Sequence, residues 1–266
     1  MKKLLVLLAL ALAACQTVRT TQPGVVGVDR EQSMLVSSAS INSAADQAYR
    51  KTLSEAQRKG QLNRDSAQVE RLRAIARRLI PHTGAFRSDA PGWKWEVHLI
   101  SSKDANAWCM PGGKMAFNTG LIERLRLSDE EIAAVMGHEI AHALREHARE
   151  RASQAMAQSI GVAVIGAAAR APAAADLTQM VLDVTFNLPN SRTDEIEADR
   201  IGVELAARSA YDPRAAVTLW EKMQKTGGGQ APQFLSTHPA HENRIADLRV
   251  YSQRVMPLYE QARAPR

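Results

Sequence analysis

Apolar residues recur at helical spacing in several segments of the chain, and this pattern predicts a mainly helical protein. Two such segments cover residues 44–62 and 65–79, and a third runs from Asp129 to about residue 155. Ser128 and Glu131 have the spacing of a capping box, in which each side chain accepts a hydrogen bond from the other residue's backbone N–H. We therefore expect a well-defined helix after Ser128.

A short β-sheet is predicted before this helix. Trp95, Val97 and Leu99 alternate with polar residues, as in a half-buried strand. The turn sequence at residues 111–113 then leads into a second strand over residues 114–118. We expect a hairpin beside the following helix, and hence an α+β fold that is mainly helical with a small sheet. An exposed hairpin edge can bind an extended peptide through main-chain hydrogen bonds, and a purely structural hairpin fits the pattern equally well.

The third helical segment contains the sequence His138-Glu139-Ile140-Ala141-His142, which has the form HExxH. On a helix, His138 and His142 project from one face and can hold a single zinc ion. Glu139 lies beside them, where it can take a proton from a metal-bound water. Small and apolar residues flank the motif, which favours a buried helix in which these polar groups need partners. The alternative is a surface helix with two solvated histidines.

A further helix is predicted from Ser191, where Glu195 and Asp199 are four residues apart and share one face. Glu197, between them, points elsewhere. A catalytic zinc site uses three protein ligands and leaves one position for water, and two histidines with one glutamate from facing helices meet that requirement. The alternative is a helix with ordinary surface carboxylates.

The amino-terminal end has the pattern of a leader sequence. A short basic start precedes an apolar run from Leu4 to Ala13, which is too short to span a bilayer and is typical of a signal peptide. The sequence Leu12-Ala13-Ala14-Cys15 resembles the lipobox of bacterial lipoproteins, which implies cleavage before Cys15 and lipidation of that cysteine. An Asp after the lipidated cysteine is the usual signal that retains a lipoprotein of enteric bacteria in the inner membrane. Gln16 stands there instead, so we expect an outer-membrane anchor that faces the periplasm. Ordinary secretion with an unrelated cysteine is the alternative.

These features divide the chain into three parts. We expect residues 1–14 to be the signal peptide, residues 15–43 a lipidated tether rich in Thr, Ser, Gly and Val, and residues 44–266 the domain that carries the zinc motif. The net charge of +6 comes from basic residues spread along helices, so nothing indicates nucleic-acid binding.

No motif surrounds the remaining cysteine or two of the histidines. With Cys15 acylated, Cys109 is the only thiol left, which excludes an intrachain disulfide. Cys109 is a weak candidate for a nucleophile, and we expect no functional role for His147 or His241.

The segment from Ser191 to Asp199 has the form Ser-Arg-x-x-Glu-x-x-Ala-Asp. Together with HExxH, it resembles the gluzincin family that contains the CAAX prenyl endopeptidases and the HtpX heat-shock proteases. The similarity extends over residues 69–250 and includes residues 106–113, 118–121, 211–216 and 236–239 and Arg244. Because no stretch reads as a transmembrane helix, the chain resembles the soluble periplasmic lipoprotein branch of that family.

The resemblance implies a zincin-like fold and a set of site residues. His138, His142 and Glu195 would bind one Zn²⁺. Glu139 would be the general base, and Asp199 would orient a ligating histidine.

The resemblance also assigns substrate binding to the hairpin, through Gly112, Gly113, Lys114, Met115 and Ala116. Trp108 and Cys109 depart from the small or apolar residues expected beside the hairpin, so the resemblance does not specify the shape of the pocket there. His238 would stabilise the developing oxyanion or cap the zinc as a fourth ligand, and an ordinary loop histidine is the alternative.

We therefore predict a zinc-dependent endopeptidase that hydrolyses misfolded or misassembled cell-envelope proteins, with the substrate class taken from the family. A non-catalytic or latent envelope chaperone with a structural zinc is the alternative, although such a site has no need of Glu139. A prenyl-protein processing enzyme would need a membrane-embedded chamber, and the sequence has no helices to build one.

Overall fold

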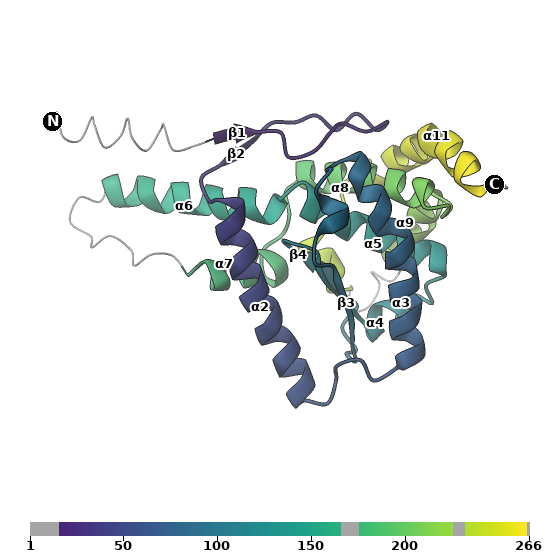
Figure 1. The fold of residues 1–266 in the computed structure, drawn as a ribbon, viewed down its shortest axis with the longest axis horizontal. Helices are drawn as coiled ribbons and strands as arrows, with labels where there is room; N and C mark the ends of the chain where they lie inside the picture. Colours follow the sequence, from purple (N-terminus) through teal and green to yellow (C-terminus); the bar gives the residue numbers. More distant parts are fainter. Residues whose placement is uncertain (1–15, 166–175, 226–231, 265–266) are drawn as a thin grey trace.

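The computed structural model describes residues 16–165, 176–225 and 232–264, with side chains omitted over 160–165 (Figure 1). The expected signal peptide and Cys15 lie outside the described residues. In chain order the elements are β1 (Gln16–Val18), β2 (Gln32–Met34), α2 (Ser38–Arg58), α3 (Ser66–Leu79), η1 (Ile80–Ala85), η2 (Ala90–Gly92), β3 (Glu96–Ile100), β4 (Ala107–Met110), β5 (Lys114–Asn118), α4 (Thr119–Arg124), α5 (Asp129–Leu144), α6 (His147–Ile165), α7 (Leu177–Phe186), α8 (Arg192–Arg208), α9 (Ala215–Lys225), α10 (Phe234–Thr237) and α11 (Arg244–Arg263). This composition confirms the predicted α+β class. Among the described helices, none has the length and apolar character needed to cross a bilayer.

Helices α5 and α8 form the centre of the molecule. The predicted capping box is present at the start of α5, and every residue from Glu131 to Leu144 is buried. The two helices meet at Gly137 and Gly202, where a Cβ added to Gly202 would lie 2.8 Å from the backbone nitrogen of His138. A side chain at either glycine would therefore force the helices apart. Their close approach sets the distance between the HExxH motif and the acidic residues of α8.

The sheet has three strands in the order β3-β5-β4. Strand β5 pairs in parallel with β3 on one side and antiparallel with β4 on the other. Its residue Met115 lies opposite Val97 of β3 and opposite Cys109 of β4. The predicted hairpin is thus confirmed as β4–β5, and β5 is the central strand. Gly113 adopts a φ of 83° in the hairpin turn, which an L side chain rarely adopts.

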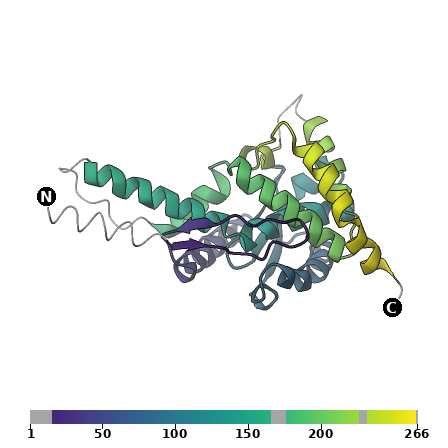
Figure 2. The ribbon, with the colours of Figure 1, turned by 90° about the horizontal axis from the view of Figure 1, so that it is seen from above.

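Residues 16–36, which we call the N-terminal strap, pack along the body of the protein. Figure 2 shows the strap beside α8, and the Val26 N–H donates to Oε2 of Glu204 on that helix at 3.0 Å. Val26, Val28 and Met34 are buried. The expectation of a tether over residues 15–43 is therefore wrong for the described residues, because these apolar side chains find a core. Helix α2 also begins at Ser38, before the expected boundary.

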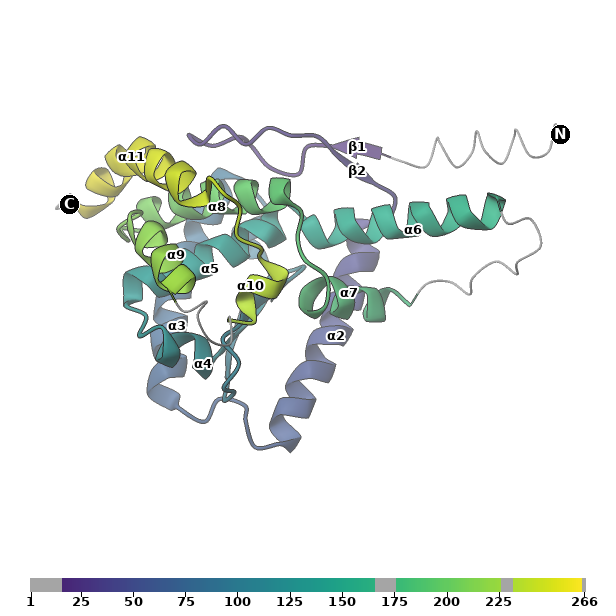
Figure 3. The same cartoon turned by 180° about the vertical axis from the view of Figure 1, so that it is seen from behind.

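Helices α2, α6 and α7 form a second layer beside the sheet (Figure 3). The ring of Trp108 on β4 makes edge-to-face contacts with Phe186 of α7 and Tyr49 of α2, with centroid distances of 5.4 and 5.8 Å. Trp108 thus joins α7 to the strand that lies next to α5.

Candidate metal centre

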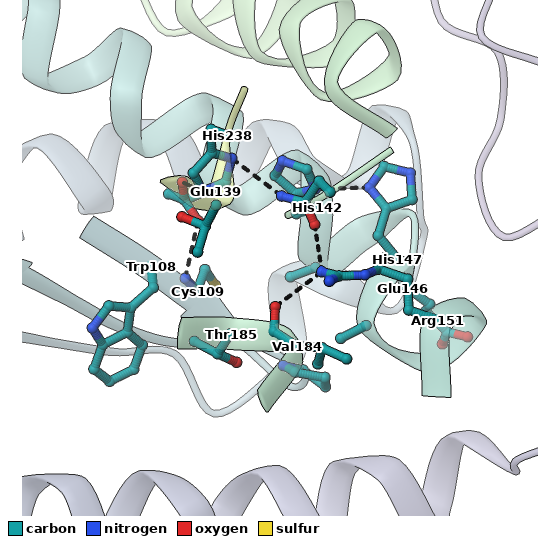
Figure 4. A pocket seen from close by; sticks show the side chains of 15 residues that line it. Trp108, Cys109, Glu139, His142, Glu146, His147, Arg151, Val184, Thr185 and His238 are labelled. Atoms are coloured by element: carbon teal, nitrogen blue, oxygen red, sulfur yellow. Dashed lines mark hydrogen bonds and ion pairs between the residues drawn. The ribbon is translucent and has the colours of Figure 1, made fainter. Parts of the chain in front are cut away.

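Four side chains from three parts of the fold converge at the crossing of α5 and α8. His138 and His142 come from α5, Glu195 comes from α8, and His238 follows α10. All four are buried, and each offers one ligand atom within 4.8 Å of the others. Figure 4 shows Glu139, His142 and His238 lining one pocket with Cys109. The sequence-predicted ligands are therefore brought together, with His238 among them.

The spacing of these atoms fits a tetrahedral metal ion. The Nε2 atoms of His138 and His142 are 3.0 Å apart, and the Glu195 oxygens lie 3.5 and 3.3 Å from them, respectively. Bonds of about 2.0 Å in a tetrahedral zinc site separate neighbouring ligand atoms by about 3.3 Å. Two imidazoles and a carboxylate at this separation are a donor set that zinc accepts.

Hydrogen bonds on the far sides of the imidazoles direct their Nε2 atoms inward. His138 Nδ1 lies 2.9 Å from Oδ1 of Asp199, the contact that the orienting role implied by the family resemblance requires. His142 Nδ1 lies 2.8 Å from His147 Nδ1. Burial lowers the pKa of both His138 and His142, which keeps them in the neutral form that binds metals.

His147, for which the sequence indicated no role, is buried with its ring against a candidate ligand. On one continuous helix, residues five apart point in different directions. Here α5 ends at Leu144, and Glu146 adopts a left-handed φ of 53° before α6 begins at His147. This break brings His147 beside His142, and helical periodicity gives no sign of it.

Arg244 is a buried guanidinium that joins two carboxylates of α8. Its Nη1 donates to Oε2 of Glu195 at 2.8 Å, and its Nη2 donates to Oδ1 of Asp199 at 2.7 Å. The guanidinium carbon lies 3.3 Å from the ring centroid of Trp220. Burial alone would raise the pKa of Glu195, but its contacts with His238, His138 and the Arg244 guanidinium outweigh burial and hold that pKa well below its ordinary value.

Glu139 lies at the open side of the cluster. Its Oε2 accepts a hydrogen bond from the backbone N–H of Cys109 at 3.2 Å, and its Oε1 is buried with no hydrogen bond from the described residues. Burial is the main cause that raises the pKa of Glu139 to about 8. The Oε1 atom makes no hydrogen bond within the described part of the chain, although His238 Nε2 lies 3.3 Å from it, and it is placed to exchange a proton with a water at the centre.

Lys114, Met115 and Ala116 of the predicted substrate segment, Gly112 to Ala116, lie in a strand that leaves no edge for an extended peptide. Strand β5 is paired on both sides, so its backbone has no free hydrogen-bonding edge. The two glycines form the hairpin turn, and Lys114 Nζ donates to Lys94 O and to Glu96 Oε1, both at 2.6 Å.

The two outer strands of the sheet differ in how their free edges are covered. The outer side of β3 is covered where Asn63 donates to Leu99 O at 2.8 Å and accepts from Leu99 N–H at 2.9 Å, and where Arg73 donates to Val97 O. The outer side of β4 faces the pocket, because its Cys109 N–H is directed at Glu139. Burial also raises the pKa of the Cys109 thiol well above its ordinary value, which argues against a nucleophilic thiolate.

Comparison with known proteins gives one family and a group of curated relatives. The family described as Peptidase family M48 matches residues 66–252. The mitochondrial metalloendopeptidase OMA1 of Arabidopsis thaliana is 36% identical over 185 residues, which cover 68% of this chain and 37% of that protein. The beta-barrel assembly-enhancing protease of Escherichia coli strain K12 is 29% identical over 211 residues, which cover 74% of this chain and 42% of that protein. The chain thus spans less than half the length of these relatives.

Proposed function

The chain belongs to peptidase family M48, and on that premise we propose that it is a zinc-dependent endopeptidase that cleaves misfolded or misassembled proteins of the cell envelope. The observation that carries the proposal is the buried set of His138, His142 and Glu195 with Glu139 beside it. The relatives support it, since they include metalloendopeptidases and an E. coli protease that enhances β-barrel assembly.

A bound Zn²⁺ would supply the Lewis-acid activation of water and of the scissile carbonyl. Glu139 then acts as the general base through Oε1, the oxygen without a hydrogen-bond partner. The Cys109 N–H holds the other oxygen and fixes the carboxylate in place. After the attack on the carbonyl, Glu139 returns the proton to the leaving amine.

The outer edge of β4 binds the substrate backbone in this proposal through its carbonyl groups, because the Ala107 N–H already donates to Asn106 Oδ1 and the Cys109 N–H to Glu139 Oε2. Because N–H and C=O groups alternate in direction along a strand, Ala107 points its backbone to the same side as Cys109. An extended peptide pairing there would pass directly over Glu139. Main-chain pairing requires no particular side chains, which suits an enzyme that acts on many unfolded proteins.

His238 caps the metal site in the resting protein. Its Nδ1 lies 3.2 Å from His138 Nε2 and 3.0 Å from Glu195 Oε1, which is within the ligand cluster. A fourth protein ligand would occupy the position that a catalytic site leaves to water. The competing role, stabilisation of the oxyanion, places the same ring beside the reacting carbonyl.

The protein is anchored to the outer membrane through a lipid on Cys15 and faces the periplasm. The lipobox sequence supports this location, as does the similarity to the beta-barrel assembly-enhancing protease of E. coli. Unfolded envelope polypeptides are the partners, and no nucleic acid is involved.

Incubation of the purified protein with an unfolded reporter protein, with and without a chelator, tests the function. We expect cleavage that the chelator removes and that the Glu139→Gln variant lacks while it still binds zinc. Substantial cleavage by that variant contradicts the role of Glu139. Binding of the reporter by zinc-loaded protein without cleavage, even after removal of the His238 ring, favours the chaperone alternative.

A further inference from the structure

A chain of hydrogen bonds runs from His142 away from the metal cluster. His147 Nδ1 lies 2.8 Å from His142 Nδ1, and His147 Nε2 lies 3.0 Å from Oε2 of Glu197. His147 is 1% exposed and Glu197 is 5% exposed, so water does not replace these contacts. We call His142, His147 and Glu197 the relay.

The relay has only one consistent arrangement of protons when His142 binds a metal. A carboxylate accepts hydrogen bonds, so His147 carries its proton on Nε2 and leaves Nδ1 as an acceptor. The Nδ1 atom of His142 must then carry the proton in the bond between the two rings. This leaves a lone pair on His142 Nε2, which is the atom that faces the metal cluster. Glu197 thus determines the tautomer of His142 through His147.

Two arginines hold Glu197 in place. Arg30 of the strap donates through Nε to Oε1 of Glu197 at 2.7 Å and makes a two-pronged contact with Glu150 at 2.6 and 2.9 Å. Arg145, which is 0% exposed, donates through Nε to Oε2 of Glu197 at 2.8 Å. The arginine–carboxylate geometry fixes the plane of the carboxylate as well as its position.

The strap also covers Arg145. The Arg145 Nη2 donates to Arg30 O at 3.0 Å, and Arg145 Nη1 donates to Thr21 Oγ1 at 3.2 Å. Gln32 donates to Arg145 O at 2.8 Å. Without the strap, Glu197 would lose Arg30 as a partner, Arg145 would lose its contacts with Arg30 O and Thr21, and Glu197 would be open to water.

We propose that His147 is a positioning residue for the metal ligand His142, and that the N-terminal strap holds His147 in place through Arg30 and Glu197. The inference rests on the proposed metal site. It means that a segment more than a hundred residues before the HExxH motif contributes to metal affinity.

Zinc affinity of the full chain, measured by competition with a chromophoric chelator, tests this role. We expect His147→Ala to weaken zinc binding by about 10- to 100-fold, as loss of a residue that orients a ligand does. His147→Gln offers an acceptor oxygen and a donor NH₂ group on a planar amide, and we expect it to restore most of the affinity. The visible bands of bound Co²⁺ should shift in His147→Ala and return toward the parent in His147→Gln.

The strap is tested by Arg30→Gln, with Arg19→Gln as the matched control. Arg19 lies in the same strap, but its ion pairs with Asp29 and Glu31 are exposed. We expect about tenfold weaker zinc binding for Arg30→Gln and parent affinity for Arg19→Gln. The comparison of Arg30→Gln with Arg19→Gln tests the role of the strap in zinc binding even when His147→Ala does not fold.

The thermal midpoint of the metal-free proteins separates positioning from general stability. Parent zinc affinity in both His147→Ala and Arg30→Gln overturns the inference, even where their midpoints fall. A parent protein that binds no zinc at micromolar concentrations overturns the proposed metal site itself. Zinc binding by the parent with unchanged binding by the variants overturns the positioning role alone.

Discussion

His238 Nδ1 lies 3.0 Å from Oε1 of Glu195, and His238 Nε2 lies 3.3 Å from Oε1 of Glu139. One ring therefore contacts both a candidate ligand and the candidate base. Its side chain is buried and stacks on Phe234 at a centroid distance of 4.2 Å. In the proposed capped state, the ring takes the position that a substrate carbonyl or a water needs beside these two carboxylates.

Replacement of His238 should therefore activate the enzyme. If the capped form dominates, the measured rate equals the rate of the uncapped enzyme multiplied by the small fraction of uncapped molecules. His238→Ala should then raise cleavage of an unfolded reporter by about tenfold. His82→Ala, on η1 away from the site, should leave the rate unchanged. A fall of about 100-fold with zinc retained would instead identify His238 as the oxyanion stabiliser.

Arg244→Met should destabilise the metal-free protein strongly. The change leaves Glu195 and Asp199 buried without their shared counter-charge, which costs about 3–5 kcal/mol. Urea unfolding of the metal-free protein measures this loss. Arg249→Met removes an exposed pair with Glu221 and should cost less than about 1 kcal/mol. Equal midpoints for the two variants would show that the buried pair contributes little.

Gly202→Ala should separate the two helices that carry the site. The added methyl group would lie 2.8 Å from the backbone nitrogen of His138, so α8 has to shift. We expect a loss of about 1–3 kcal/mol in unfolding free energy, together with weaker zinc binding. Gly92→Ala is the control, because no atom lies within 4 Å of its added Cβ. Parent values for Gly202→Ala would mean that the crossing tolerates the wider spacing.

Glu146 should give the protein a stability that depends on pH. It accepts hydrogen bonds from Arg87 at 2.8 Å, from Arg149 and from Ser38. Burial raises the pKa of Glu146, but the two arginines outweigh burial, so its pKa lies below the ordinary value of 4.5. The resulting stabilisation is present above pH 4.5 and is lost as the pH falls below it.

Glu146→Gln should therefore cost about 1–3 kcal/mol at pH 7, and the difference from the parent should shrink below pH 4.5. Unfolding free energies of the two metal-free proteins at pH 7 and in acid measure this. Glu31→Gln removes an exposed partner of Arg19 and should have a small effect at both values. A cost for Glu146→Gln that is the same in acid would assign it to packing instead of charge.

Local patterns predicted the centre of the molecule. The capping box of α5, the HExxH spacing and the shared face of Glu195 and Asp199 depend on residues within one helix, and the structure has them as expected. The family resemblance is confirmed as well. The predictions were wrong where distant segments decide the structure.

Three features could not be read from local sequence. The position of β5 depends on its parallel pairing with β3, and a hairpin pattern does not specify the order of strands. The strap has the composition of a linker, and its ionic partners Glu150 and Glu197 lie more than a hundred residues away. The contact of His147 with His142 requires the helix break at Glu146, which helical periodicity does not indicate.

The docked strap changes what a lipid on Cys15 would do. Strand β1 begins at Gln16, the next residue, and a single residue spans at most about 3.6 Å. A protein acylated at Cys15 would have almost no flexible linker between the bilayer and its folded domain. It would lie against the membrane in one orientation, and its reach would be limited to polypeptides that arrive at the lipid surface.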